Sequence, residues 1–193
     1  MTERVGFAGT GLMGRGMAKN ILAAGYPLAV VAHHNRAPVE ALLGQGATEL
    51  PSYHQLAAAS DLVLICVTGT PEVESVVHGP DGLLEGAHEG LIVVDCSTSE
   101  PASSARIAEA LAERGASFAD APLARTPAEA EAGRLNAMVG ASQAEFARVR
   151  PVLEACCENI FHMGPVGAGH KTKLIYNLIT MGYADARAGE RLL

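Results

Sequence analysis

Apolar and polar positions along this chain follow two alternating patterns. Short, nearly continuous apolar runs occur at 4–8, 28–32, 62–67, 91–95 and 117–119. Such runs are typical of strands that are covered on both faces of a sheet. Helical patterns lie between them, at 12–24, 37–45, 53–59, 71–78 and 101–114. The alternation predicts an α/β fold with a doubly wound parallel sheet.

The pattern changes toward the C-terminus. Two strand-like pieces, 136–139 and 159–162, flank a helical pattern at about 142–156. One long helix is then predicted to run to the end of the chain. We therefore divide the chain into a sheet domain, 1–165, and a long helix, 166–193. The apolar stripe of that helix either packs against the sheet domain or leads into a further domain.

The first apolar run leads directly into a glycine-rich turn. Gly9, Gly11 and Gly14 have the spacing G-x-G-x-x-G, and a helical pattern follows at once. A strand, a tight turn and a helix N-terminus in this order bind a pyrophosphate, so a Rossmann-type dinucleotide site is predicted. Leu12 and Met13, which complete the turn, are predicted to contact the same cofactor. The alternative is a plain strand-to-helix turn.

Composition narrows the class of protein. The 193 residues are 49% apolar and carry a net charge of −7 without a basic block, so nucleic acid is not an expected partner. No apolar run reaches transmembrane length, and no signal peptide is recognised, so no membrane association is predicted. The four cysteines match neither a zinc site nor a disulfide framework. We expect no metal and a reducing, cytoplasmic setting.

The segment after the second strand bears on the choice of cofactor. An Asp or Glu at this place would hold the ribose 2′-hydroxyl of NAD. The chain instead has His33, His34 and Arg36, and the nearest acid is Glu40. Arginine and histidine attract a 2′-phosphate, so NADP is favoured, with NAD as the alternative.

Polar residues follow the third and fourth predicted strands. Val67 and Thr68 come after one strand, and Ser97 and Thr98 after the next. Ligands of an open parallel sheet bind outside the carboxyl ends of its strands. These residues are therefore predicted to meet the cofactor, and Ser97 also the substrate. Capping of the following helices is the alternative role.

The long helix carries the remaining chemistry. Lys173 and Asn177 are four residues apart, so they share one helical face. An amine beside an amide suits a polar substrate, with the lysine as an acid–base group. A solvated surface charge is the alternative for Lys173.

These motifs together resemble the β-hydroxyacid dehydrogenases, including 3-hydroxyisobutyrate dehydrogenase and 2-hydroxy-3-oxopropionate reductase. Their NADP-binding domain is of the 6-phosphogluconate dehydrogenase type. The matching segments are GFAGTGLMG at 6–14, DCST at 95–98, FADAP at 118–122, GRLNAMVG at 133–140 and GAGHKTKLIYN at 167–177. The resemblance implies hydride transfer between a nicotinamide and a small hydroxy acid or semialdehyde acid. It makes Lys173 the general acid, Asn177 a substrate contact and Thr98 a cofactor contact.

Two departures from the family pattern change the expectation. The usual Ser-Gly-Gly cradle for the substrate carboxylate is absent, and Arg125 stands there to bind a small carboxylate substrate instead. The family also continues into an all-helical second domain that builds a homo-oligomer. The chain is expected to lack that domain, and hence to bind NADP weakly and to turn over poorly. A catalytically weak NADP-binding module is the alternative function. Imine reduction is a further one, although imine reductases usually lack the lysine.

Overall fold

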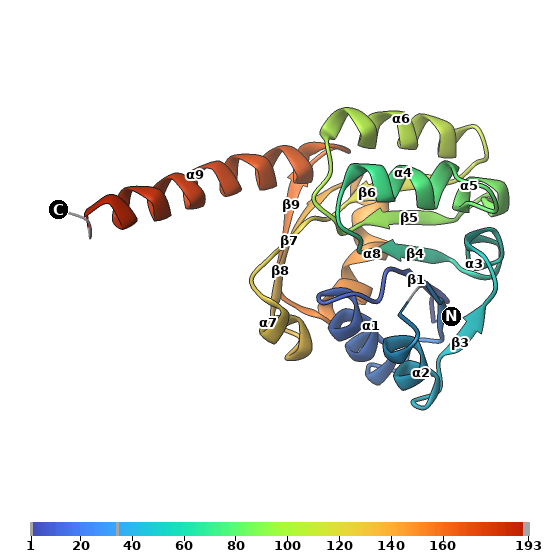
Figure 1. Ribbon diagram of the computed structural model, residues 1–193. Coiled ribbons are helices and arrows are strands. Elements are labelled where there is room, and N and C mark those ends of the chain that lie inside the picture. Colours follow the sequence, from blue (N-terminus) through green and yellow to red (C-terminus); the bar gives the residue numbers. More distant parts are fainter. Residues whose placement is uncertain (1, 34, 191–193) are drawn as a thin grey trace.

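The structure is a computed structural model that describes residues 2–33 and 35–190, with side chains described through residue 183. A nine-stranded sheet forms the centre of the described part, and helices cover both of its faces (Figure 1). The α/β class predicted from the sequence is confirmed.

The strand order identifies the edge at which ligands bind. The strands lie in the order β3 (Thr48–Leu50), β2 (Leu28–Val31), β1 (Val5–Ala8), β4 (Leu62–Ile65), β5 (Ile92–Asp95), β6 (Ser117–Asp120), β8 (Leu135–Gly140) and β7 (Leu123–Ala124), while β9 (Cys157–Gly164) pairs with β8. The order reverses between β1 and β4. The carboxyl ends of these two strands therefore form the crevice where doubly wound proteins bind their ligands.

Most of the described helices form two layers, one on each face of the sheet, and the last one extends away from the body. The described helices are α1 (Gly14–Ala23), α2 (Ala37–Leu43), α3 (Tyr53–Ala59), α4 (Thr70–His78), α5 (Leu83–Gly86), α6 (Pro101–Ala112), α7 (Pro127–Glu131), α8 (Gln143–Glu154) and α9 (Ala168–Glu190). Residues of α1, α2 and α8 pack on one face of the sheet, and residues of α3 to α6 pack on the other. Helix α9 extends away from the body (Figure 1). No described helix combines the length and apolar character that crossing a membrane requires.

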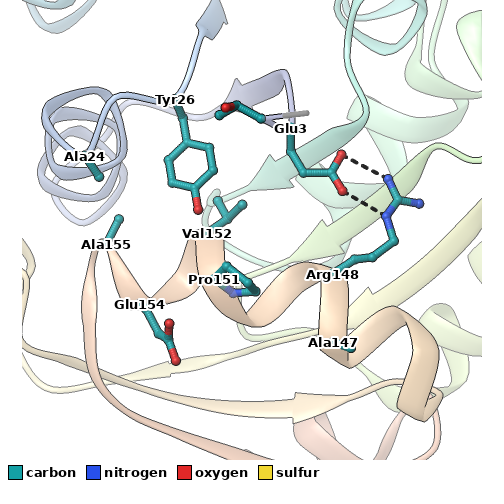
Figure 2. Close-up of a pocket in the computed structure, with 10 residues that line it drawn as sticks. Glu3, Ala24, Tyr26, Ala147, Arg148, Pro151, Val152, Glu154 and Ala155 are labelled. Atoms are coloured by element: carbon teal, nitrogen blue, oxygen red, sulfur yellow. Dashed lines mark hydrogen bonds and ion pairs between the residues drawn. The ribbon is translucent and has the colours of Figure 1, made fainter.

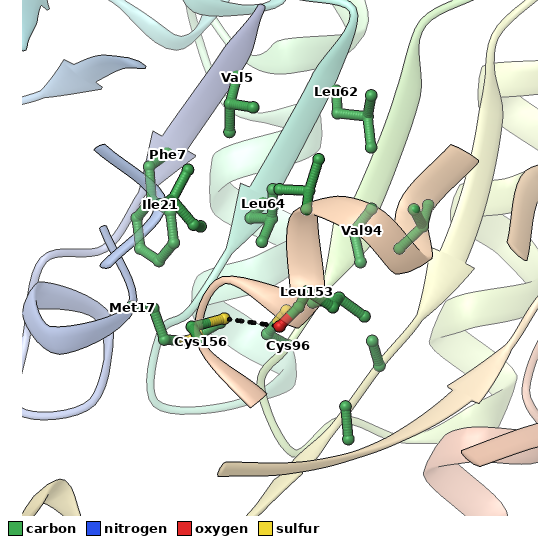
Figure 3. Packing of buried hydrophobic residues seen from close by; sticks show 14 of the residues in the cluster. Val5, Phe7, Met17, Ile21, Leu62, Leu64, Val94, Cys96, Leu153 and Cys156 are labelled. Carbon is green, nitrogen blue, oxygen red and sulfur yellow. Dashed lines mark hydrogen bonds between the residues drawn. The ribbon is translucent and has the colours of Figure 1, made fainter. Parts of the chain in front are cut away.

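Alternate residues of the parallel strands feed the two apolar layers. Figure 3 shows Phe7 and Leu64 from the sheet against Met17 and Ile21 of α1, all at most 1% exposed. Cys96 belongs to the same layer and Cys66 packs against it. Burial raises the pKa of the Cys66 thiol to about 12 and raises that of the Cys96 thiol well above its usual value, so both are packing residues rather than nucleophiles.

Four short elements and one strand direction depart from the predictions. Strands β3 and β7 and helices α5 and α7 have two to five residues each, too few to produce a periodic pattern. The sheet is not wholly parallel, because β8 runs antiparallel to β6 and β7. Strand β7 continues in the direction of β6, and β8 returns between them after α7, so it runs antiparallel to both.

Candidate dinucleotide and substrate site

The glycine turn lies between β1 and α1, at the reversal of strand order. Gly9 has a φ of +97°, and a β-carbon on it would lie 2.2 Å from the carbonyl oxygen of Cys66. A β-carbon on Gly14 would lie 1.9 Å from the carbonyl oxygen of Gly9. These two positions therefore admit only glycine, because the turn and the start of α1 pack against neighbouring backbone.

The outer side of the same turn is open. A β-carbon on Gly11 would meet no described atom within 4 Å, and the neighbouring Leu12 is 70% exposed. Met13 occupies the N-cap of α1, where no side-chain cap and no first-turn acid occur among the described residues. The amide of Arg15 donates to the carbonyl oxygen of Gly11 at 3.1 Å, and the amides of the turn before it lie at the positive end of the helix dipole. The turn fits an anionic dinucleotide.

The segment after β2 presents a charge that is already paired. Arg36 donates to both carboxylate oxygens of Glu49, at 3.0 and 2.9 Å, and lies 3.8 Å from Glu40. His33 is exposed beside it. His34 lies outside the described residues. The structure therefore places Arg36 at the expected edge but directs its guanidinium toward β3.

The loops after β4 and β5 are joined by a hydroxyl. The Val67 amide donates to Ser97 Oγ at 3.0 Å, and Ser97 is buried. Thr68 and Thr98 are exposed at the same edge. The two exposed threonines remain candidates for cofactor contacts, whereas the Ser97 hydroxyl already holds the two loops together.

Lys173 lies on the face of α9 that meets the body. It is 8% exposed, and burial lowers the pKa of its ammonium group. Its Nζ atom is 4.9 Å from the ring centroid of Tyr176, which gives the cation a favourable aromatic neighbour. Asn177 follows one turn later and is half-buried. The structure therefore keeps Lys173 and Asn177 on one face, as predicted.

Arg125 occupies an unusual backbone position. Its φ of +88° is one that glycine normally adopts. The exposed guanidinium donates to the carbonyl oxygen of Arg134 and to the carboxylate of Glu158. Its described hydrogen-bond partners are these two groups, and Lys173 and Asn177 are not among them.

Sequence reasoning assigned no role to a buried polar cluster beneath α9. Asp95, Asp120, Ser104 and His170 are each at most 1% exposed, and the first three each lie within 3.8 Å of the His170 imidazole. Asp120 and His170 both stand in segments that match the family motifs. Their place in these motifs was the only feature of the sequence that pointed to them. Their contact could not be predicted, because it joins residues 50 positions apart and forms only in the folded chain. The described residues contain no group of three or more ligands arranged to hold a metal.

A hollow of about 670 Å³ lies elsewhere on the molecule. Figure 2 shows Tyr26 on one side of it and Pro151 of α8 on the other, with Glu3 facing Arg148. Arg148 donates to both carboxylate oxygens of Glu3, at 2.9 and 3.1 Å. Glu3 and Tyr26 precede β1 and β2, so this hollow lies at the amino ends of the strands, away from the glycine turn.

The fold, the glycine turn and the open first turn of α1 together define a dinucleotide-binding domain of the doubly wound class. The model of the NAD-binding domain of 6-phosphogluconate dehydrogenase matches residues 4–164. The chain belongs to this family, and with it to the NAD(P)-binding oxidoreductases of β-hydroxyacid dehydrogenase type. The resemblance inferred from the motifs is thereby confirmed.

Named relatives extend this result. The chain is 38% identical to 2-(hydroxymethyl)glutarate dehydrogenase of Eubacterium barkeri, covering 98% of itself and 62% of the relative. It is 38% identical to 3-hydroxyisobutyrate dehydrogenase of Pseudomonas aeruginosa, covering 100% and 63%. The chain thus spans less than two thirds of the length of these relatives.

Solved structures agree with the sequence relatives. The crystal structure of 3-hydroxyisobutyrate dehydrogenase from Salmonella typhimurium matches with a TM-score of 0.88 and 31% identity, over 97% of this chain and 65% of that one. Psf3 in complex with NADP+ and 2-OPP matches with a TM-score of 0.84 and 32% identity, over 91% and 62%. An imine reductase from a Pseudomonas species, at 20% identity, shares the fold.

Proposed function

We propose that the protein takes part in hydride transfer between NAD(P) and a small β-hydroxy acid or semialdehyde acid, with Lys173 as the general acid and base. The observation that carries the proposal is the burial of the Lys173 side chain on the face of α9 that meets the body. Burial disfavours the charged form of a lysine, so a lysine that is only a solvated surface charge is not normally buried. A buried lysine is therefore a candidate for a functional role.

Burial also prepares Lys173 for its role. A lysine amine ordinarily has a pKa of about 10.4, too high for easy proton exchange near neutral pH. The lowered pKa brings the group closer to the range in which it both gives and takes a proton. In the reducing direction Lys173 donates a proton to the carbonyl oxygen of the substrate, and in the oxidising direction it removes the hydroxyl proton.

The remaining residues bind and orient. The amides of the glycine turn hold the pyrophosphate, and Thr68 and Thr98 flank the nicotinamide end at the carboxyl edge. When bound, the nicotinamide supplies or accepts the hydride. Asn177 orients the substrate oxygen from the next turn of α9. Arg125 binds the substrate carboxylate after exchanging its contact with Glu158, an exposed pair that stabilises little by itself.

The test is an assay of this chain beside a chimera. The chimera continues α9 into the last third of the 3-hydroxyisobutyrate dehydrogenase of Pseudomonas aeruginosa, which this chain does not span. We expect the chimera to oxidise NADPH or NADH with small semialdehyde acids, and this chain to do so poorly. Lys173→Met should lower kcat of the chimera by at least about 100-fold.

The matched control is Lys171→Met, because Lys171 is exposed on the same helix two residues earlier. It should leave kcat unchanged. Full activity of the Lys173→Met chimera would refute the acid–base role. Dinucleotide binding without turnover of any acid would favour the binding module instead.

We also propose that Arg36 favours NADP over NAD. Its pair with Glu49 is exposed to solvent and so contributes little, and a dianionic 2′-phosphate can compete for the guanidinium. Arg36→Ala should weaken NADPH binding by about 10-fold without changing NADH binding, and Glu49→Gln should strengthen NADPH binding. Equal changes for both nucleotides in calorimetric titrations would contradict this preference.

A further inference from the structure

The start of α9 is capped by a carboxylate from a distant strand. Asp120, at the end of β6, is fully buried. Its Oδ1 accepts the Gly167 amide at 2.6 Å, and its Oδ2 accepts the His170 amide at 2.6 Å. A charged acceptor on two first-turn amides gives strong hydrogen bonds and opposes the positive helix end. Asp120 therefore fixes the first turn of α9 to the sheet.

The side chain of His170 makes a second attachment. The imidazole is fully buried, with Nδ1 2.8 Å from Ser104 Oγ and Nε2 3.2 Å from the carbonyl oxygen of Ser97. Nε2 also lies 3.6 Å from the Asp95 carboxylate. Ser104 belongs to α6, and Ser97 to the loop after β5. His170 thus ties α9 to two further elements, one of which bears Thr98.

The first two turns of α9 provide its attachment to the body. A β-carbon on Gly169 would lie 2.2 Å from the carbonyl oxygen of Met138, so the helix backbone rests directly on β8. Beyond Lys173 the apolar side chains of the helix are exposed, with Leu174 at 45%, Ile175 at 60% and Leu178 at 75%. The place of Lys173 is therefore set by the turn that precedes it.

We propose that Asp120 and His170 are positioning residues that set where the ammonium group of Lys173 lies relative to the Ser97–Thr98 loop. His170 and Lys173 are three residues apart, so they lie on the same side of α9. A misplacement of about 1 Å costs a reaction on the order of 100-fold, because proton transfer needs hydrogen-bond reach. The inference rests on the proposed function, in which Lys173 moves the proton and neither positioning residue touches the substrate.

The test uses the whole chain and needs no turnover. The chain has three lysines, Lys19, Lys171 and Lys173, so carbon-13 labelling at lysine gives three signals to titrate by NMR. In the wild type, Lys173 should titrate below the ordinary value of about 10.4. Asp120→Asn replaces one acceptor oxygen with a donor. It should move the Lys173 titration upward and speed amide exchange at residues 167 and 170 by about 10- to 100-fold.

A pair of substitutions at His170 keeps the test valid if Asp120→Asn fails to fold. The carboxamide of His170→Gln can still donate to the Ser97 carbonyl and accept from the Ser104 hydroxyl. In this variant Lys173 should therefore titrate as it does in the wild type. His170→Ala removes both contacts and should not. In the chimera with the last third of the Pseudomonas aeruginosa enzyme, His170→Gln should keep a higher kcat than His170→Ala. The KM of both variants should change little.

The matched control is Asp61→Asn at the opposite edge of the sheet. Asp61 also accepts a backbone amide, that of Arg4, at 2.8 Å. This variant should lose stability and leave the Lys173 titration unchanged. An unchanged Lys173 titration in Asp120→Asn and His170→Ala would overturn the inference, even in an active enzyme. An inactive chimera whose Lys173 titration shifts as expected would refute the proposed function and leave the positioning role standing.

Discussion

The starts of α1 and α9 lie at the same edge of the sheet and differ in what satisfies their amides. Among the described residues, α1 has no side-chain cap, and the space beside Gly11 is open. The amides of Gly167 and His170 at the start of α9 instead donate to the buried carboxylate of Asp120. Both helix ends attract an anion. The first leaves its positive end open, and the second receives the anion from the protein.

The two helices are also held in different ways. Met17 and Ile21 are fully buried, so α1 is fixed along its length by the core. Leu178 and Ile179 of α9 are 75% and 65% exposed, so α9 is fixed by its first turns. A rigid helix with an open start suits binding. A helix anchored by a polar start couples the place of Lys173 to a few buried groups.

The largest effect is expected from Gly14→Ala, which breaks the start of α1. Its β-carbon would lie 1.9 Å from the carbonyl oxygen of Gly9, so the turn must shift. The free energy of unfolding should fall by about 1–3 kcal/mol, as in overpacked interiors, and NADPH binding should be lost. Urea unfolding and calorimetric titration measure the two effects.

Gly11→Ala separates binding from stability at the same turn. Its β-carbon meets no described atom within 4 Å, so the free energy of unfolding should change by less than about 0.5 kcal/mol. NADPH affinity should nevertheless fall, because the methyl group stands where the pyrophosphate approaches. A loss of stability equal to that of Gly14→Ala would show that the turn is not open on its outer side.

A smaller effect distinguishes two carboxylates by pH. Hydrogen bonding from Arg4 lowers the pKa of Asp61 to about 2, whereas burial raises the pKa of Asp120. The stability that Asp61 contributes is present above its unfolded pKa of about 3.9, and it is lost as the pH falls toward about 2. Because the side chain is 30% exposed, we expect about 1 kcal/mol.

Acid unfolding curves of two variants check this difference. In Asp61→Asn, the fall in stability between about pH 3.9 and pH 2 should become smaller. In Asp120→Asn, this fall should stay as it is in the wild type. The same acid slope in Asp61→Asn and in the wild type would contradict the assignment to Asp61.

One substitution in α9 is expected to raise stability rather than lower it. Burial lowers the pKa of Lys173, so its charged form costs folding free energy at neutral pH, and this cost disappears as the pH rises toward about 10.4. Lys173→Met should therefore raise the free energy of unfolding at pH 7 by about 0.5–1 kcal/mol. Thermal unfolding of Lys173→Met measures this gain, with the exposed Lys171→Met as the control. A lower Tm for Lys173→Met but not for Lys171→Met would contradict the claim that the buried charge of Lys173 costs stability.

The sequence predicts the parts of the fold that repeat a period. The apolar runs at β1, β4 and β5 and the helix after the glycine turn have enough residues for a pattern to be recognised. The two residues of β7 do not, and their place in the sheet depends on antiparallel pairing with β8. Short elements of this kind are specified by tertiary contacts rather than by local propensity.

The candidate site divides in the same way. The glycine spacing and the pair Lys173 and Asn177 are local, and each is predicted from a few neighbouring residues. The contact of Asp120 with His170 joins residues 50 positions apart, and the pairing of Arg36 with Glu49 joins a loop to β3. A sequence pattern can indicate that such a residue matters, but it does not identify the partner, because the two residues meet only in the folded chain.

The contrast between the two helix starts is tested most directly by NMR. Nitrogen-15-labelled chain would be titrated with NADP+ while the backbone amide signals are followed. We expect the largest shifts at residues 11–14 and little change at 167 and 170, whose amides donate to Asp120. Shifts centred on 167 and 170, or none at 11–14 at saturating NADP+, would contradict the assignment of the α1 start as the dinucleotide site.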